Sequence, residues 1–412
     1  MDRNTWQRII FLTGVASEMR DDVQDFDFDE VIDRRGTHSA KWDAMGARFG
    51  LSGDDLIPMW VADMDFRAPP PVNDAVQGLI DHGVHGYFGD EAEMKDAVIG
   101  WLSTRHGWTP DADWITTVHG LVAGIGLTIQ AMTEPGDGII IFSPVYHMFG
   151  NTIRAARRRV LESPLREIQG RYEMDFDALE ELAEGARMVI LCSPHNPGGR
   201  VWDAEELRQL ADFCKRHDLI LVSDEIHMDL VFSESTHHMT AKAAPDIKDQ
   251  LVTLVAPTKT FNVAASLTGF PIISNPDLRA KFAAQKASCG LGATNRFGAI
   301  VATAAFQHGA PWLDALIPYL QANRDRLDQA VAERLPGIRS MRLEATYLAW
   351  LNFADTGLSP KEALDKVNND ARIVVNSGPS FGLGGEQWLR FNFACPRATL
   401  DTAIERLVAT FA

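Results

Sequence analysis

A lysine, Lys259, stands shortly after a run of β-branched and apolar residues, LVTLVA at 251–256. A lysine in this place is either an ordinary surface charge or an amine that forms a covalent bond with a carbonyl group. Four more apolar runs end in polar or aromatic side chains, or in a glycine that opens a helical pattern. In chain order, these run ends hold His119-Gly120-Leu121, Tyr146, Asn196, and Asp224 with His227.

The elements that position these residues alternate between short apolar runs and amphipathic patterns. The predicted strands are 114–118, 138–142, 188–193, 219–224 and 251–256, and helical patterns cover 120–132 and 203–217. Near-continuous apolar strands alternating with helices predict an α/β architecture whose mostly parallel sheet is covered on both faces. Ligands bind beyond the carboxyl ends of such strands, where these residues lie.

Each residue also has a plainer explanation when it is taken alone. Asp224 could cap a helix, Tyr146 could belong to the core, and Asn196-Pro197-Gly198-Gly199 is a favourable turn sequence. Five such groups at the same end of successive strands are much harder to explain as coincidence. One ligand that needs all of them would explain the set.

Pyridoxal 5'-phosphate is such a ligand. Its aldehyde needs an amine to hold it as a Schiff base, which Lys259 can supply, and its pyridine nitrogen needs an anion, which Asp224 can supply. Its phenolic oxygen needs a donor, either Asn196 or His227. Its ring needs a flat partner, and Tyr146 can stack on it.

The phosphate group of this cofactor needs free backbone N–H groups at a helix N-terminus. Gly120 and Leu121 offer these groups, and glycine permits the backbone to approach closely. The hydroxyl of Thr258 lies next to Lys259 in the sequence. We expect these three residues to bind the phosphate.

The order and spacing of these motifs resemble those of a known family. NPGG is followed by DEIH and then by TK, with Asp224 28 residues after Asn196 and Lys259 35 residues after Asp224. The sequence resembles fold-type I pyridoxal-phosphate enzymes, within them the MalY/PatB group of cystathionine β-lyase-like C–S lyases, which is grouped with the class I/II aminotransferases. The segments that carry the resemblance are FDFDEVIDRRGTHSAKWD, IPMWVADMDF, SPHNPGGRVW, VSDEIHMDLVF, TKTFNVAASLTG, GAPWLDAL, TYLAWL and LRFNFACPR.

The resemblance implies a domain organisation and an assembly. It implies a large cofactor-binding domain at 71–304 and a small domain built from 26–70 and 305–412, after an N-terminal extension at 1–25. It also implies a homodimer whose active sites lie at the subunit boundary, with Tyr87 in HGYFGD reaching the phosphate of the partner subunit.

The resemblance also implies roles for single residues. Lys259 would hold the cofactor and then move the proton of the substrate α-carbon, while Asp224, Asn196, His227 and Tyr146 keep the roles given above. Arg390 would bind the substrate α-carboxylate, which suits a planar guanidinium. Asp63 and Asp65 of VADMDF are expected near the substrate entrance, with no role assigned.

Two positions depart from patterns seen in related enzymes. Ala256 stands where many relatives have a phosphate-binding serine, so Thr258 or a backbone group has to take over that contact. Leu267 stands where many aminotransferases have a phosphate-binding arginine. The C–S lyase group resembles this chain in lacking that arginine.

The sequence therefore predicts β-elimination from L-cystathionine or a related cysteine S-conjugate. An aminotransferase acting on an L-amino acid is the alternative, because both reactions begin with loss of the α-proton. A cofactor-bound regulatory protein that acts through protein contacts is the alternative from another class. GPSFG at 378–382 matches a nucleophile elbow, but glycines rather than a helix follow it, so we interpret it as a loop before the strand of Arg390.

Composition narrows the partners. Lys and Arg number 39 against 56 Asp and Glu, a net charge of −17, which disfavours nucleic acid and anionic membrane surfaces. The basic cluster Arg154, Arg157, Arg158 and Arg159 is interpreted as a solvated helix face rather than an anion site. The four cysteines are dispersed without a CxxC pair, and RIIFLTGVA at 8–16 lacks the features of a signal peptide. A cytoplasmic protein without a membrane span or bound metal is expected.

Overall fold

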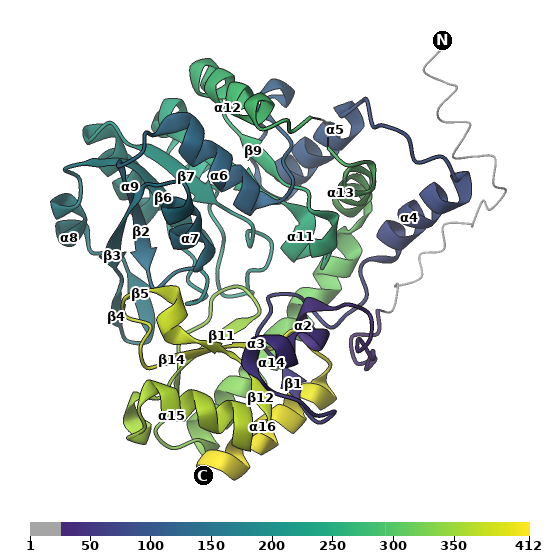
Figure 1. Ribbon diagram of the computed structural model, residues 1–412, viewed down its shortest axis with the longest axis vertical. Coiled ribbons are helices and arrows are strands. Elements are labelled where there is room, and N and C mark those ends of the chain that lie inside the picture. Colours follow the sequence, from purple (N-terminus) through teal and green to yellow (C-terminus); the bar gives the residue numbers. More distant parts are fainter. Residues whose placement is uncertain (1–25, 293) are drawn as a thin grey trace.

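The computed structural model describes residues 26–292 and 294–412, and the expectation for the extension at 1–25 lies outside them. A six-stranded sheet forms the centre of the larger part of the molecule (Figure 1). Its strands, in spatial order, are β3 (Arg159–Pro164), β2 (Gly138–Ser143), β6 (Ala186–Cys192), β7 (Ile220–Asp224), β8 (Leu251–Val255) and β9 (Phe270–Ile272). All neighbouring strands are parallel except β8 and β9. The predicted α/β architecture is confirmed.

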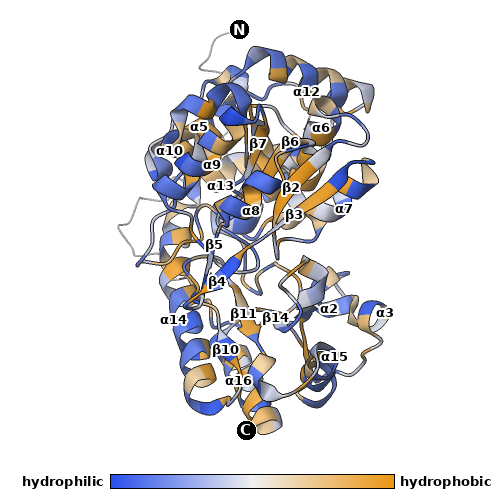
Figure 2. Ribbon diagram, turned by 90° about the vertical axis from the view of Figure 1, so that its left-hand side faces the viewer, coloured by the Kyte–Doolittle hydropathy of each residue, from blue (hydrophilic) through white to orange (hydrophobic). Residues whose placement is uncertain are grey.

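Helices cover both faces of this sheet, which explains why its strands are almost continuously apolar. One face packs against α6 (Leu121–Met132), α7 (Met148–Ala155) and α12 (Pro276–Ser288), and the other against α8 (Phe176–Glu181), α9 (Ala204–Arg216) and α10 (Thr240–Ala243). Strand β2 shows the alternation, because Ile139 and Ile141 join the first core while Ile140 and Phe142 join the second. In Figure 2 the strands of this sheet are mostly coloured hydrophobic, whereas the sides of α9 and α10 that face the viewer are mostly hydrophilic.

One predicted strand was wrong. Residues 114–118 begin in a 3-10 turn, η2 (Ala112–Trp114), and pair only through two isolated bridges, Ile115–Ile272 to β9 and Val118–Gly269 to the residue before it. Pro271 explains the gap between the bridges. Thr116 N donates to the Pro271 carbonyl at 2.9 Å, but proline has no N–H to return the bond. The remaining four strands and both helices are confirmed within one to two residues at their ends.

A second, antiparallel sheet lies in the C-terminal part of the chain. Its order is β10 (Arg339–Ser340), β11 (Leu348–Asn352), β14 (Trp388–Asn392) and β13 (Asn376–Ser377). Next to it, β1 (Ile57–Pro58) pairs in parallel with β12 (Ile373–Val374), so a segment near the start of the described chain lies beside its last third. The division into domains at 26–70, 71–304 and 305–412 is compatible with these sheets and stays a prediction.

The remaining helices connect and flank the two sheets. The longest, α14 (Ala310–Arg334), runs between them in Figure 1. The others are α2 (Ala40–Asp43), α3 (Met45–Phe49), α4 (Pro70–His82), α5 (Ala92–Trp101), α11 (Pro257–Thr260), α13 (Arg296–His308), α15 (Pro360–Asp365) and α16 (Arg397–Phe411). Among the described residues, no helix is long and apolar enough to cross a membrane.

Candidate active site

The site is built where three neighbouring parallel strands end at the same level. Cys192, the last residue of β6, is in register with Asp224 of β7, and Asp224 with Leu254 of β8. Ser193 N donates to the Asp224 carbonyl at 2.9 Å, and Glu225 N donates to the Leu254 carbonyl at 2.9 Å. These bonds hold the loops that follow the strands against one another, so that the side chains they carry share one edge of the sheet.

Lys259 lies on the single turn α11, which follows β8 directly. Its Nζ donates to the Ala62 carbonyl at 2.5 Å. Burial lowers the pKa of this amine to about 8, with Arg390 acting in the same direction and the carboxylates of Asp63 and Asp224 opposing it. An amine with this pKa loses its proton far more readily than an exposed lysine, which suits it to bond a carbonyl group and to accept a proton.

Asp224 is buried, with 5% of its surface exposed. Burial raises its pKa to about 7, with Glu225 adding to the rise, while the backbone N–H of Ile226 and the Lys259 charge oppose it. Its Oδ1 accepts a hydrogen bond from Ile226 N at 3.2 Å. Within residues 26–292 and 294–412, no cation lies within 4 Å of this carboxylate. A buried carboxylate in this state favours a cationic N–H partner.

Arg390 comes from β14 of the second sheet and reaches across to the first. One nitrogen donates to Asn196 Oδ1 at 3.1 Å, and the other donates to the Trp60 carbonyl at 2.7 Å and to Asn376 Oδ1 at 2.8 Å. The Nε–H is buried without a partner among the described residues. Because a guanidinium has five N–H donors, donors remain for a carboxylate, and the three bonds fix its plane.

Asn196 and Tyr146 are held together by their backbones, since Tyr146 N donates to the Asn196 carbonyl at 3.0 Å. The ring of Tyr146 packs edge-on against His147 and Phe149. Burial raises the pKa of its hydroxyl, with the Arg390 charge opposing this rise and the Asp224 charge adding to it. His227 is buried, its Nδ1 has no hydrogen-bond partner in the described part of the chain, and burial, with the charges of Lys259 and Arg390, lowers its pKa to about 3. His227 is therefore neutral and able to donate one N–H.

Gly120 and Leu121 open helix α6 beside this edge. Gly120 precedes the helix with φ of 85°, a left-handed conformation that glycine adopts without strain. Leu267, which also has a positive φ, lies nearby, because a Cβ built on Gly120 would be 3.9 Å from its Cδ2. Thr258 is 8% exposed on α11, and the neighbouring Ser266 Oγ is buried without a partner in the described chain.

These features test whether the residues suit pyridoxal phosphate, and they do. Among the described residues the carboxylate of Asp224 lacks a cation and the Ser266 hydroxyl lacks a partner, the amine of Lys259 has a lowered pKa, and a glycine leads into α6. The ring nitrogen of the cofactor matches the carboxylate, its aldehyde matches the amine, and its phosphate matches the glycine and the hydroxyl. Tyr87, in contrast, is fully exposed on the loop between α4 and α5, away from this site.

Three groups around Lys259 were missed by the sequence reasoning as functional residues. The Tyr347 hydroxyl donates to the same Ala62 carbonyl at 3.0 Å, and Asn392 and Asn262 bind the backbone on either side of it. Tyr347 lies in TYLAWL, which has the pattern of a buried strand. That pattern does not indicate a hydrogen bond to Ala62, which is 285 residues away in the chain.

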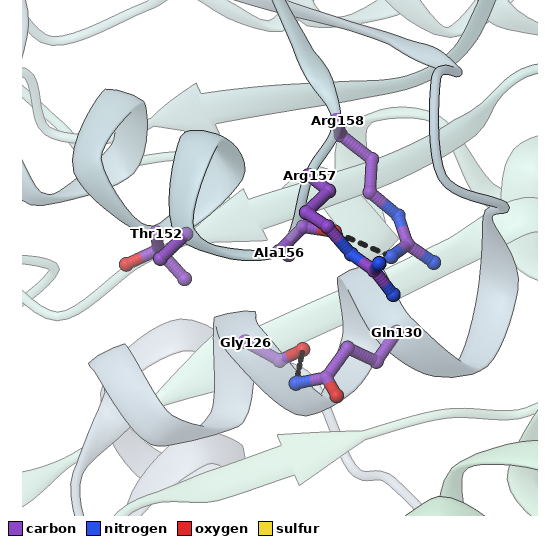
Figure 3. A pocket seen from close by; sticks show the side chains of 7 residues that line it. Gly126, Gln130, Thr152, Ala156, Arg157 and Arg158 are labelled. Carbon is purple, nitrogen blue, oxygen red and sulfur yellow. Dashed lines mark hydrogen bonds between the residues drawn. The ribbon is translucent and has the colours of Figure 1, made fainter.

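Two other candidate features have a different role from the one their sequences suggest. GPSFG lies beside the site, because its Phe381 ring packs 5.0 Å from the Arg390 guanidinium. Ser380 of GPSFG is exposed and donates to the Ser377 carbonyl at 2.6 Å in a 3-10 turn, so it is no nucleophile elbow. The basic cluster borders a hollow of about 310 Å³ between α6 and α7 (Figure 3). There Arg158 donates to the Ala156 carbonyl at 2.6 Å and to Thr133 Oγ1 at 2.9 Å, so its guanidinium is already hydrogen-bonded within the protein.

Comparison with known proteins agrees with this geometry over nearly the whole chain. A model of the family "Aminotransferase class I and II" matches residues 55–407. Cystathionine beta-lyase PatB of Bacillus subtilis is 40% identical over 384 residues, which are 93% of this chain and 99% of that protein.

Two solved structures are also similar. Cystalysin from Treponema denticola, which contains a pyridoxal 5'-phosphate cofactor, superposes with a TM-score of 0.91 and 33% identity over 94% of this chain and 98% of its own. A pyridoxal-phosphate-bound C–S lyase from Staphylococcus hominis superposes with a TM-score of 0.87 and 31% identity over the same shares.

Proposed function

We propose that this chain, which belongs to the class I and II aminotransferase family, is a pyridoxal-phosphate-dependent C–S lyase. Its substrate is L-cystathionine or a related cysteine S-conjugate, and its products are pyruvate, ammonia and a thiol. The observation that carries this proposal is the buried amine of Lys259. Burial and the Arg390 guanidinium lower its pKa, while the buried carboxylate of Asp224 raises it. The choice of a lyase rests on the names of the relatives that match it over almost their full length.

The chain's own residues divide the work of the reaction. Arg390 binds the α-carboxylate of the substrate, and the neutral amine of Lys259 removes the proton from the α-carbon. When bound, pyridoxal phosphate supplies an electron sink for the pair left on that carbon. Asp224 would pair with the ring nitrogen, Tyr146 would stack on the ring, and Asn196 and His227 would serve the phenolic oxygen. Gly120, Leu121 and Thr258 bind the phosphate.

The bond that breaks next decides between lyase and aminotransferase. In the lyase, the β-carbon–sulfur bond breaks, sulfur leaves as a thiolate that takes up a proton, and water later releases pyruvate and ammonia. In an aminotransferase, the amino group passes instead to a 2-oxo acid. Both outcomes use the same residues for the first proton transfer.

One assay separates the two reactions. We expect the purified holoenzyme to form pyruvate from L-cystathionine without any added 2-oxo acid, in equal amount to the thiol. With 2-oxoglutarate and an amino acid that carries no leaving group on its β-carbon, we expect little glutamate. Glutamate production without pyruvate from L-cystathionine would refute the lyase proposal and leave the aminotransferase.

We also propose a homodimer with shared active sites. Tyr87, Val84 and Phe297 are exposed near one another, because Arg296 donates to the Val84 carbonyl at 2.8 Å and the rings of His85 and Phe297 are 5.4 Å apart. An exposed apolar and aromatic cluster favours a protein contact. In it, Tyr87 would reach the phosphate in the partner subunit. Sedimentation analysis should give twice the mass of one chain, and a monomer would contradict the proposal.

The remaining proposed feature is the cytoplasmic location. Cys192, Cys214 and Cys395 are buried, Cys289 is exposed, and all four are free thiols. Free thiols in every position suit a reducing compartment. Cell fractionation with an antibody against the chain tests this location.

Replacing Arg390 with lysine tests the carboxylate site. A lysine keeps the positive charge but loses the planar set of donors, so we expect KM for the amino acid to rise roughly 10- to 100-fold, from the loss of about 1.5–3 kcal/mol in charge-assisted hydrogen bonding. We expect kcat to change less, since the bond to the carboxylate is made before and during the reaction. Steady-state kinetics with L-cystathionine measures both. An unchanged KM would remove Arg390 from substrate binding.

A further inference from the structure

The segment Trp60–Phe66 is an irregular stretch that passes directly over Lys259. Side chains from distant parts of the chain bind its backbone carbonyls. The bonds are Arg390 to Trp60 at 2.7 Å, Asn392 to Val61 at 2.6 Å, Lys259 and Tyr347 to Ala62 at 2.5 and 3.0 Å, and Asn262 to Met64 and Phe66 at 3.0 and 2.8 Å. The segment is therefore fixed relative to the amine of Lys259.

Two carboxylates of this segment are held by cations from the chain before it. Arg34 donates to Asp63 Oδ1 at 3.2 Å and to Oδ2 at 2.8 Å, and also to Asp65 Oδ1 at 2.7 Å. Lys41, which is completely buried, donates to Asp65 Oδ2 at 2.7 Å, and Trp42 Nε1 donates to Asp65 Oδ1 at 3.0 Å. Asp65 thus has three close partners, while Asp63 binds Arg34 closely and lies 3.8 Å from the amine of Lys41.

The two carboxylates differ in what they face. Asp63 follows Ala62, whose carbonyl accepts the Lys259 N–H. Its charge raises the pKa of Lys259, and after burial it is the largest influence on that amine. It also adds to the rise that burial produces in the pKa of Tyr347. Asp65 instead binds Lys41, and it is not among the groups that shift the pKa of Lys259.

The other charged and titratable groups around Lys259 come from three further elements. Asp224 lies at the end of β7, Arg390 on β14, His227 after β7, and Tyr347 before β11. The proposed function pairs Asp224 with the ring nitrogen and Arg390 with the substrate. Asp63 is then the carboxylate in this set with no role in binding the cofactor or the substrate, and its partners in the described chain are Arg34 and, at 3.8 Å, Lys41.

We propose that Asp63 is a positioning residue for the reaction, whose carboxylate, clamped by Arg34, stabilises the protonated nitrogen of Lys259. This inference rests on the proposed role of Lys259. In the proposed mechanism no residue of the segment 34–65 touches the substrate. The inference gives this segment a role, because Asp63 would then affect proton transfer by Lys259. Arg34 in turn sets how much of the Asp63 charge Lys259 experiences, because a guanidinium paired with the carboxylate partly cancels its field.

The test uses two substitutions that break the same ion pair and have opposite electrostatic signs. Asp63→Asn removes a negative charge, so the midpoint of the pH titration of the visible absorption of the lysine-bound cofactor should fall by about 0.5–1 unit. Arg34→Gln leaves the Asp63 charge uncompensated, so the same midpoint should rise. The acid limb of kcat/KM should move in the same direction as the absorption midpoint in each variant.

Asp65→Asn is the matched control, since it disrupts the same ion-pair cluster two residues away. We expect it to lower the melting temperature while the absorption midpoint stays near that of the wild type, and Asp63→Glu should restore the midpoint. Equal midpoints in Asp63→Asn, Arg34→Gln and wild type, or shifts of the same sign in both variants, would overturn the inference. If Asp63→Asn fails to fold, a midpoint in Arg34→Gln that falls or stays unchanged does the same. A wild-type holoenzyme without visible absorption would contradict the proposed function instead.

Discussion

Replacement of Lys259 by alanine should remove the visible absorption of the bound cofactor and lower kcat by at least ~10²–10⁴-fold, the usual contribution of one group that transfers a proton. The side chain supplies both the covalent link and the base, and no other lysine of the described residues acts on the pKa of its amine. Arg390 is the other basic group of the described site. Burial lowers its pKa to about 10, so it keeps its proton at neutral pH and does not replace Lys259 as the base. Absorption spectra and single-turnover kinetics measure the two losses separately.

The matched control for this substitution is Lys248→Ala. Lys248 is exposed and lies just before the amino end of the same strand β8, while Lys259 lies beyond its carboxyl end. This variant should keep the spectrum and kcat of the wild type. Reduction with borohydride should fix the cofactor on the peptide that contains Lys259 in both wild type and Lys248→Ala. A label found on another lysine, or an unchanged spectrum in Lys259→Ala, would refute the assignment.

The sequence was informative wherever a function depends on local pattern. Residues 188–193, 219–224 and 251–256 predicted strands because their two faces are both apolar, and the polar residues after them were then expected at one edge. The structure places Asn196, Asp224 and Lys259 at that edge. The exception at 114–118 came from a residue elsewhere, since Pro271 on the neighbouring strand lacks the N–H that would complete the pairing.

Groups that act through long-range contacts gave no comparable signal. Tyr347 donates to Ala62, and Asn262 binds Met64 and Phe66, so these contacts depend on how the two sheets meet. Asp63 and Asp65 look alike in the sequence, yet the charge of Asp63 raises the pKa of Lys259, whereas Asp65 binds the buried Lys41 at 2.7 Å. Only packing distinguishes them, because the pattern VADMDF places both on the same side of a strand-like segment without saying what lies opposite.

The second large effect is expected from Asp224→Asn, a change that keeps the shape of the side chain and removes its charge. An uncharged amide does not hold a proton on the ring nitrogen, so the electron sink weakens while Lys259 still binds the aldehyde. Breaking a buried charge pair costs about 3–5 kcal/mol, which corresponds to a fall in kcat of ~10²–10⁴-fold. The visible absorption should remain, which separates this variant from Lys259→Ala. Asp224→Glu, which keeps the charge, should retain part of the activity, and a wild-type kcat in Asp224→Asn would contradict the pairing.

The pH dependence of cofactor binding gives the same prediction a second readout. Burial raises the pKa of Asp224 to about 7 in the protein without its cofactor, and only the ionised carboxylate attracts a protonated ring nitrogen. The dissociation constant of the cofactor should therefore rise as pH falls below about 7, because the carboxyl group must first lose its proton. In Asp224→Asn no such proton exists, so this part of the pH dependence should disappear. Equilibrium binding of pyridoxal phosphate between about pH 5.5 and 8.5, roughly one and a half units either side of that pKa, compares the two proteins. Identical pH profiles would show that another group binds the ring nitrogen.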